Sequence, residues 1–222
     1  MKSTMKMCGI LFLVCFSFYY TEKIAYIMQD KDNLMIQINN LKDNYDVNYV
    51  NAIINENTII PGINGIAVNS KKSYSKMKSF NVFNETYLEY DQIKPSVSLE
   101  NNKDKIIIKG NKNKKAIAFI VENDFIKSYL LNSGYKIDYQ NICVIKSVES
   151  LCEDYLYKVK PSIIINHQNA LINKNYIESG DIILINKNVT LSEIKSILEE
   201  IKYRDLNIIS LNELISEEKN IN

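Results

Sequence analysis

The chain has 222 residues, of which 46% are hydrophobic and 24% charged, the composition of an ordinary globular protein. Its formal net charge is +1 and Arg204 is its only arginine, which argues against a nucleic-acid-binding surface. His167 is the only histidine, so any site built on two or three imidazoles of this chain is excluded.

The N-terminus carries a basic start and an apolar run. Lys2 and Lys6 precede residues 7–20, and the run extends to Met28, which gives the roughly 20 residues that a spanning helix needs. Bulky residues at 18–20 disfavour a cleaved signal peptide, and Val14 before Cys15 disfavours a lipoprotein signal. We therefore expect residues 1–28 to be an uncleaved signal anchor in the cell membrane. The basic residues before the run place the remainder outside the cytoplasm, as a single-pass protein. The alternative is a buried first helix of a soluble domain.

Residues 29–48 are predicted to form a helical stalk. Ile27, Leu34, Ile38 and Leu41 recur at helical spacing, and the helix is expected to end near 43–44. An amphipathic stalk that lies on its own domain is favoured. The alternative is a short coiled coil with another membrane protein through Leu34 and Ile38.

Residues 49–112 are predicted to form a small α+β segment. Pro61-Gly62 and Asn64-Gly65 are strong turn signals, and Asn69 or Ser70 can cap a helix. The expected elements are a hairpin of 50–54 with 58–60, a helix over 70–78, and strands over 87–90 and 105–109.

Residues 113–222 alternate between apolar strands and helices, which predicts a largely parallel sheet covered by helices. The expected strands are 116–122, 141–145, 162–166, 182–185 and 207–210. The expected helices are 124–132, 148–157 and 191–203, and the stretch 206–215 is expected to end in a short helix. On the helix over 191–203, Glu193, Lys195, Glu199 and Lys202 are expected to form a solvated face, and Leu198 to pack inward.

Two cysteines of this half, Cys143 and Cys152, have no Cys-x-x-Cys partner. We expect them to be free core thiols. A disulfide between them is the alternative if the domain lies in an oxidising compartment.

The C-terminal stretch 180–186, followed by 189–194 and 206–215, resembles the closing unit of the polysaccharide deacetylase (NodB-homology) family. A second block, 59–69 with 72–78, resembles the region that precedes the deacetylase-like domain in membrane-anchored members from low-GC bacteria. The resemblance implies a (β/α) barrel. Only about 100 residues are available for it, against roughly 200 to 250 for a full barrel of this class.

The resemblance also implies a zinc-dependent deacetylase, but the motifs that would carry this chemistry are missing. The Leu-x-His pattern at the end of the final strand is Leu184-Ile185-Asn186, and the His-x-x-x-His pair is absent. Glu122 and Asp124 stand where the family has its Asp-Asp pattern, but out of register. His167 follows the predicted strand 162–166, at the end of a strand where catalytic groups gather in such folds. We expect no catalytic residue, no metal and no cofactor, and treat Glu122, Asp124, His167 and Asn186 as vestigial candidates.

The sequence therefore predicts an α/β protein: a shortened deacetylase-like barrel or open parallel sheet, preceded by a small α+β segment and an N-terminal membrane helix. The favoured function is a non-catalytic envelope protein that binds peptidoglycan, another envelope glycan or a protein of wall metabolism. One alternative is a divergent, zinc-dependent carbohydrate deacetylase. Another is a structural, membrane-anchored interaction protein. No nucleic-acid partner is expected.

Overall fold

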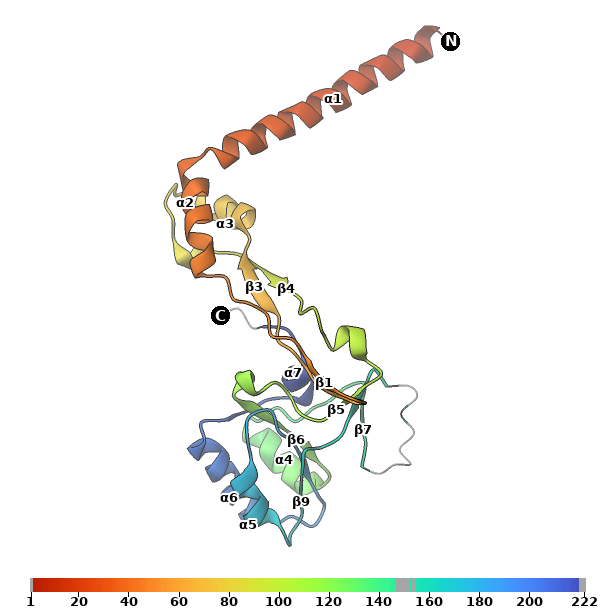
Figure 1. The fold of residues 1–222 in the computed structure, drawn as a ribbon, viewed down its shortest axis with the longest axis vertical. Coiled ribbons are helices and arrows are strands. Elements are labelled where there is room, and N and C mark those ends of the chain that lie inside the picture. The colour runs from red at the N-terminus through yellow and green to blue at the C-terminus, as the bar shows by residue number, and fades with distance from the viewer. Residues whose placement is uncertain (1, 147–151, 153–154, 220–222) are drawn as a thin grey trace. The chain divides into compact units, whose positions relative to one another are not determined.

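The computed structural model describes residues 2–146, 152 and 155–219, with side chains described for residue 7 and from residue 10 onward (Figure 1). The chain divides into two compact units. The first comprises Met1–Val47 and Ile66–Asp91, and the second Asn48–Gly65 and Gln92–Asn222.

The first unit begins with helix α1, Lys2–Asp30. Its segment Ile10–Asp30 is long and apolar enough to cross a membrane, and none of its most apolar window is buried inside the protein. An N-terminal helix with these properties is a membrane span or a signal sequence. The expected apolar helix at the N-terminus is therefore present.

Helix α2, Asn33–Leu41, follows after a turn at Lys31 and Asp32. The predicted continuous helix is thus wrong, because the Asp32 carboxylate accepts the N–H of Leu34 at 2.9 Å and starts a new helix. A 3-10 turn at Lys42–Asn44 ends the helical region where the sequence predicted.

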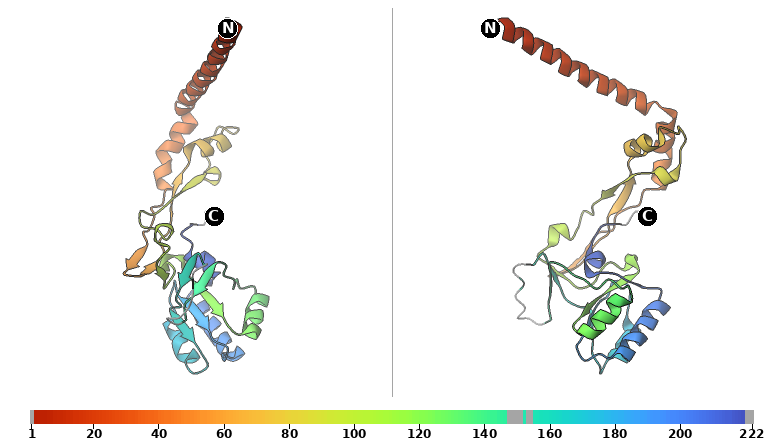
Figure 2. Two further views of the ribbon diagram at one scale, coloured as in Figure 1. Left: turned by 90° about the vertical axis from the view of Figure 1, so that its right-hand side faces the viewer. Right: turned by 180° about the vertical axis from the view of Figure 1, so that it is seen from behind.

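Helix α2 packs against α3, Ser70–Met77, and against a two-stranded ribbon of β3, Gly65–Val68, and β4, Tyr90–Ile93 (Figures 1 and 2). Asn69 caps α3 by accepting the N–H of Lys72 at 2.9 Å, as expected. Leu34 and Ile38 are buried in the core of this unit, at 3% and 0% exposure. The stalk helix therefore lies on its own domain, and these two side chains are unavailable for a coiled coil. The core of the unit is formed by Leu34, Met35, Ile38, Val68, Tyr74, Met77 and Leu88.

The second unit holds a parallel four-stranded sheet of order β11-β6-β10-β9. Its strands are β6, Ala116–Val121; β9, Ile163–Ile165; β10, Ile182–Ile185; and β11, Asn207–Ile208. A five-stranded sheet has the order β1-β2-β5-β8-β7. Its strands are β1, Ile53–Asn55; β2, Thr58–Ile60; β5, Ile106–Ile107; β7, Ile142–Val144; and β8, Tyr157–Val159. Strands β2, β5, β8 and β7 are parallel to one another, and β1 closes a hairpin on β2.

Side chains alternate across the four-stranded sheet, and each face has its own core. Ile117, Phe119 and Val121 face the layer of α4, Asp124–Asn132; α5, Ala170–Asn173; and α6, Leu191–Tyr203 (Figure 2). Ala116, Ala118 and Ile120 face a second core that includes residues of β2, β5, β7 and β8 and of the short helix α7, Leu211–Ile215. Two largely parallel sheets, with helices on the four-stranded one, confirm the predicted α/β class.

Two glycines make close turns possible. A Cβ on Gly180, whose φ is 92°, would lie 2.4 Å from the Gly110 carbonyl oxygen. A Cβ on Gly62 would lie 2.3 Å from the Val50 carbonyl oxygen, which explains the Pro61-Gly62 signal.

Three element predictions need correction. Tyr87 lies in a 3-10 turn at Glu85–Tyr87, not in a strand, because the Asn84 side chain accepts the N–H of Thr86 at 3.0 Å. Strand β8 begins at Tyr157, where the sequence predicted the end of a helix; residues 147–151 and 153–154 of that prediction lie outside the described residues. The expected face of exposed charges on α6 is wrong at Glu193, which is 8% exposed. Further 3-10 turns lie at Glu100–Asn102, Lys112–Lys114 and Lys174–Tyr176.

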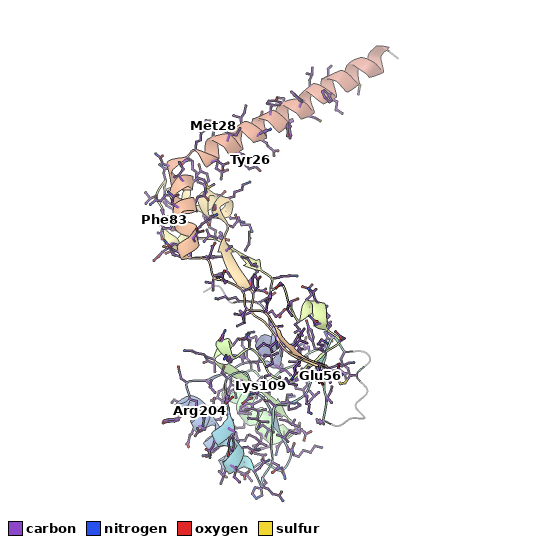
Figure 3. All side chains as sticks on the ribbon, in the orientation of Figure 1. Tyr26, Met28, Glu56, Phe83, Lys109 and Arg204 are labelled. Atoms are coloured by element: carbon purple, nitrogen blue, oxygen red, sulfur yellow. A yellow bond between two sulfur atoms is a disulfide. The ribbon has the colours of Figure 1, made fainter. Side chains whose placement is uncertain are left out.

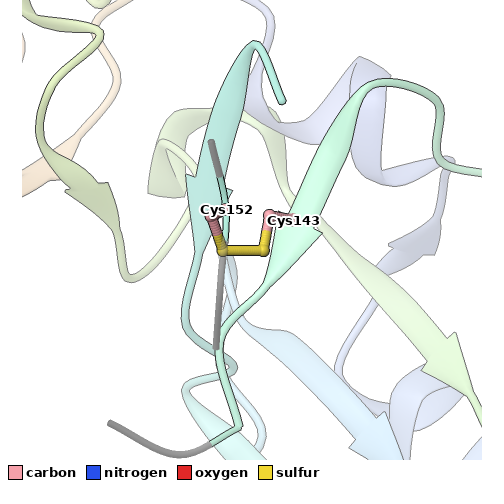
Figure 4. Close-up of a disulfide and its surroundings, with 2 residues drawn as sticks. All are labelled: Cys143 and Cys152. Carbon is pink, nitrogen blue, oxygen red and sulfur yellow. A yellow bond between two sulfur atoms is a disulfide. The ribbon is translucent and has the colours of Figure 1, made fainter. Parts of the chain in front are cut away.

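Cys143 of β7 and Cys152 form a disulfide, with 5.6 Å between their Cα atoms (Figure 4). The prediction of two free thiols is therefore wrong. The two cysteines are only nine positions apart. Sequence spacing alone could not distinguish a disulfide from two buried thiols, because a disulfide requires the two Cα atoms to lie close together in the folded protein.

Candidate functional site

The carboxyl ends of β6, β10 and β9 lie side by side at one edge of the parallel sheet. The N–H of Glu122, after β6, donates to the carbonyl of Ile185 at 3.0 Å. The N–H of Asn186, after β10, donates to the carbonyl of Ile165 at 2.9 Å. Parallel pairing therefore brings Glu122, Asn186 and His167 to neighbouring strand ends, and we call the residues 122–123, 166–167 and 186 the rim.

At the rim, the Glu122 carboxylate forms an ion pair with Lys146. The Glu122 side chain is 22% exposed and that of Lys146 is 51% exposed. Lys146 follows β7, so the pair joins the carboxyl ends of two strands from different sheets. The Lys146 ammonium thus occupies one side of the Glu122 carboxylate.

His167 makes the second polar contact of the rim. Its Nδ1 lies 2.8 Å from Oε1 of Glu193, in the first turn of α6. The His167 side chain is 62% exposed, whereas that of Glu193 is 10% exposed. The imidazole is therefore held from the protein side while its other edge faces solvent.

Glu193 also completes the capping box of α6. Its Oε2 accepts the Thr190 N–H at 2.7 Å and the Thr190 hydroxyl at 2.8 Å. Burial raises the pKa of the Glu193 carboxyl, but the two hydrogen bonds from Thr190 and the nearby His167 outweigh it, so the pKa lies below its usual value. Glu193 thus stays ionised and fixes both the helix start and the imidazole.

Asp124, unlike Glu122, His167 and Asn186, belongs to a helix. It is the first residue of α4 and exposed, while the preceding Asn123 caps the helix by accepting the N–H groups of Phe125 and Ile126 at 3.1 Å. An acidic residue at this position stabilises the positive end of the helix dipole. Asn123 also donates to the Lys187 carbonyl at 2.7 Å and so ties the loop after β6 to the loop after β10.

The remaining rim side chains are amides. Asn166 Oδ1 accepts the N–H of Gln168 at 3.0 Å and of Asn169 at 3.1 Å, which shapes the loop after β9. Next to the rim, Phe125 is 65% exposed. An asparagine amide can hydrogen-bond a polar ligand, and an exposed aromatic ring can stack on a flat apolar face.

Zinc does not fit the rim. Among the residues that the structure describes, no three His, Cys, Asp or Glu side chains are grouped so that they could hold a metal ion. The chain offers one imidazole, that of His167, which contacts the carboxylate of Glu193 in α6. The same carboxylate accepts the Thr190 N–H, and the rim carboxylate of Glu122 is paired with Lys146. No hydrolytic step through a metal can be derived from this donor set.

Two rim partners, Lys146 and Glu193, were missed from the sequence. Glu122 directly follows β6 and Lys146 lies two positions after β7, so a charged residue close to the end of each strand was the available signal. For Glu193 the signal was the spacing Thr190-x-x-Glu193 before an apolar run, which is typical of a capping box.

A pocket of about 380 Å³ lies elsewhere in this unit. Lys94, Lys103, Tyr157 and Glu217 are among its lining residues, and no rim residue is. Burial, the largest effect, and the nearby Glu217 and Glu100 raise the pKa of Tyr157.

No family model matches the chain. The uncharacterized protein YlxY of Bacillus subtilis is 38% identical over 105 residues, which cover 47% of this chain and 33% of YlxY. The chain therefore spans about a third of the length of this curated relative.

Two solved structures share the fold. BA3943 of Bacillus anthracis, a CE4 family pseudoenzyme, superposes with a TM-score of 0.55 at 17% identity and covers 86% of this chain and 97% of its own. A BA3943 mutant, described as a CE4 family pseudoenzyme with restored enzymatic activity, has a TM-score of 0.51 at 16% identity and covers 85% and 100%. Such identities establish the fold alone.

The deacetylase-like α/β fold inferred from the C-terminal stretch is thereby confirmed: the chain has the fold of a CE4 family pseudoenzyme, with an apolar helix at its N-terminus.

Proposed function

We propose that the chain is a membrane-anchored envelope protein whose deacetylase-like domain has no hydrolytic activity and binds an N-acetylated glycan at the rim. The observation that carries the proposal is how the rim groups are paired. Glu122 is held by Lys146 and His167 by Glu193, in the place where this fold gathers the ends of its parallel strands. The groups that remain are suited to recognition, not to activation of water.

The rim offers the chemistry that sugars require. The amide of Asn186 can exchange hydrogen bonds with hydroxyl and acetamido groups, and the outward edge of His167 adds one more polar contact. The exposed ring of Phe125 can stack on the C–H face of a pyranose. The likeness to a CE4 family pseudoenzyme supports a glycan as the class of ligand.

A location outside the cytoplasm is supported by two independent features. The segment Ile10–Asp30 is long and apolar enough to span a membrane. The disulfide between Cys143 and Cys152 belongs to an oxidising compartment. Together they favour a signal anchor with the folded part on the outer face.

The binding test uses the protein without residues 1–28 and N-acetylglucosamine oligosaccharides in titration calorimetry. Phe125→Ala and Asn186→Ala are expected to weaken binding about tenfold each, about 1.4 kcal/mol. Tyr203→Ala is the matched control, since Tyr203 is 86% exposed but lies at the end of α6, away from the rim residues in sequence and contacts. Equal affinity in all three variants, or no binding at all, would overturn the glycan proposal.

The enzyme alternative is tested with zinc and the same oligosaccharides in a deacetylation assay. Turnover that depends on stoichiometric zinc and is lost in Asp124→Ala would replace the proposal with a hydrolase. We expect neither zinc retention nor acetate release.

The anchor is tested by fractionation. Deleting residues 1–28 is expected to move the protein from the membrane to the soluble fraction, and continued membrane association would contradict a spanning α1. For the interaction-protein alternative, a crosslinker at Ile36, which is 44% exposed on α2, reports a partner better than one at the buried Leu34 or Ile38.

A further inference from the structure

The last turns of α1 and the helix α3 form a lysine-lined groove within the first unit. It is an open depression of about 500 Å³, lined by Tyr26 and Gln29 of α1, by four residues of α3 and by Glu89. The residues from α3 are Lys71, Lys72, Ser75 and Lys76. We call this feature the lysine groove; Tyr26 is labelled near the end of α1 in Figure 3.

The charges of the lysine groove are not balanced. Lys72 pairs with Asp91 at 2.9 Å, and Lys76 pairs with Glu89. The Lys71 ammonium lies 4.5 Å from the centre of the Tyr26 ring, and within the described part of the chain no carboxylate is its partner. Its positive charge is therefore offset by the ring face alone.

The lysines are also accessible. The side chains of Lys72 and Lys76 are 60% and 57% exposed although each has a carboxylate partner. Exposed pairs of this kind contribute little to stability. The hydrogen bond from Lys72 to Asp91, the largest effect, raises the pKa of Lys72, so this lysine remains a cation at neutral pH.

The position of Tyr26 fixes the depth of the lysine groove. The apolar segment ends at Asp30, four positions after Tyr26, which corresponds to about 6 Å along a helix. Aromatic side chains at the end of a spanning helix lie at the level of the lipid headgroups. If α1 spans the bilayer, Lys71 over Tyr26 lies where phosphate groups are concentrated.

We propose that the lysine groove binds the headgroup phosphate of an anionic phospholipid in the leaflet from which α1 emerges. The inference rests on the anchor part of the proposed function. Lys71 supplies the unpaired ammonium, and Lys72 and Lys76 can share their charge between their carboxylates and the phosphate. The half-exposed ring of Tyr26, labelled in Figure 3, can contact the start of the acyl chains.

The experiment uses the full chain in nanodiscs of phosphatidylcholine that contain a minor fraction of phosphatidylglycerol. Native mass spectrometry counts the lipids that stay bound when the disc is stripped. Phosphatidylglycerol is expected to be enriched over phosphatidylcholine on the wild type. Lys71→Gln should reduce that preference about fivefold, which corresponds to about 1 kcal/mol for one lysine near a membrane surface. The double variant Lys71→Gln/Lys76→Gln should abolish it.

The matched control is Lys195→Gln, an exposed lysine on α6, which should keep the wild-type preference. Circular dichroism of each variant checks that the helices are intact. An unchanged preference in folded Lys71→Gln/Lys76→Gln, or equal retention of the two lipids by the wild type, would refute the lipid site. Loss of bound phosphatidylglycerol when glycerol phosphate is added would point to a free phosphate ligand and also count against it.

Failure of the anchor itself gives a different result. A chain that does not span the membrane will not incorporate into the nanodisc, whereas a spanning chain without a lipid site incorporates and retains both lipids equally.

Discussion

Nδ1 of His167 lies 2.8 Å from Oε1 of Glu193, which links the loop after β9 to the first turn of α6. The same carboxylate accepts the N–H and hydroxyl of Thr190. One buried acidic side chain therefore holds both the only imidazole of the chain and the start of its longest helix in the second unit. This double role makes Glu193 a sensitive point of the rim.

Replacing Glu193 with Gln should lower the free energy of unfolding by about 1 kcal/mol near neutral pH, the usual contribution of a helix cap. Because the folded-state pKa of Glu193 is lowered, its stabilisation is present above the unfolded value and is lost as the pH falls through the folded value. Urea unfolding of both proteins between pH 7 and pH 3 measures this. The two curves should converge at the acidic end; a constant difference across the range would contradict the assignment.

Replacing Ile197 with Ala should destabilise the domain by roughly 2 to 5 kcal/mol. This side chain of α6 is fully buried in the core, and its truncation leaves a cavity. Leu198, which the sequence suggested as the inward position, is only partly buried, so Leu198→Ala should cost less. Lys195→Ala, on the exposed side, should change stability by no more than about 0.5 kcal/mol. Thermal unfolding of the three variants should show the largest loss of stability for Ile197→Ala and the smallest for Lys195→Ala. A different order would mean that α6 presents another face to the core.

Reducing the disulfide should destabilise the second unit by about 2 to 3 kcal/mol, since the cysteines are nine positions apart and closing a loop of that size removes entropy from the unfolded chain. Non-reducing peptide mapping tests whether Cys143 and Cys152 are joined. Unfolding with and without reductant gives the free energy, with Cys143→Ser/Cys152→Ser as the variant that no reductant should affect.

Gly180→Ala should be much more harmful than Gly134→Ala. Both glycines have positive φ, 92° and 86°, so both substitutions carry backbone strain of about 1 kcal/mol. Around Gly134 no atom lies within 4 Å of the added Cβ, whereas at Gly180 the Gly110 carbonyl oxygen lies at 2.4 Å. The Gly110 N–H also donates to the Gly180 carbonyl at 2.7 Å, so relief of the clash breaks this hydrogen bond. Equal melting temperatures for the two variants would contradict the close approach.

Much of the local structure could be predicted from the sequence. The apolar runs 116–121 and 182–185 became buried strands, and α4 and α6 begin and end at the residues expected. The expected short helix near the C-terminus is present as α7. These elements could be predicted because they depend on short-range features of the sequence, namely apolar periodicity and helix caps such as Asn123. Tyr87 and the strand at Tyr157 were misjudged, because a side-chain cap and a distant pairing with β5 decide them.

The candidate site could be predicted only in part. The sequence predicted that Glu122, His167 and Asn186 follow strands, and parallel pairing then brings the strand ends together. The sequence did not predict the ion pair between Lys146 and Glu122, because these residues are 24 positions apart and lie after strands of different sheets. The lysine groove could not be predicted either. It depends on the packing of α3 against α1, and no sequence pattern links Tyr26 with Lys71.

By itself, the sequence determined the apolar N-terminal helix, the buried strands β6 and β10 with the helices α4 and α6, and the lack of a histidine set, because each depends on residue types and short-range spacing. Only the tertiary structure decided that Cys143 pairs with Cys152, that Glu193 is buried against His167, and that Lys71 lies over Tyr26. Those contacts join residues whose proximity is set by the packing of whole elements, and the free energy that selects the packing is spread over two cores in the second unit and one in the first.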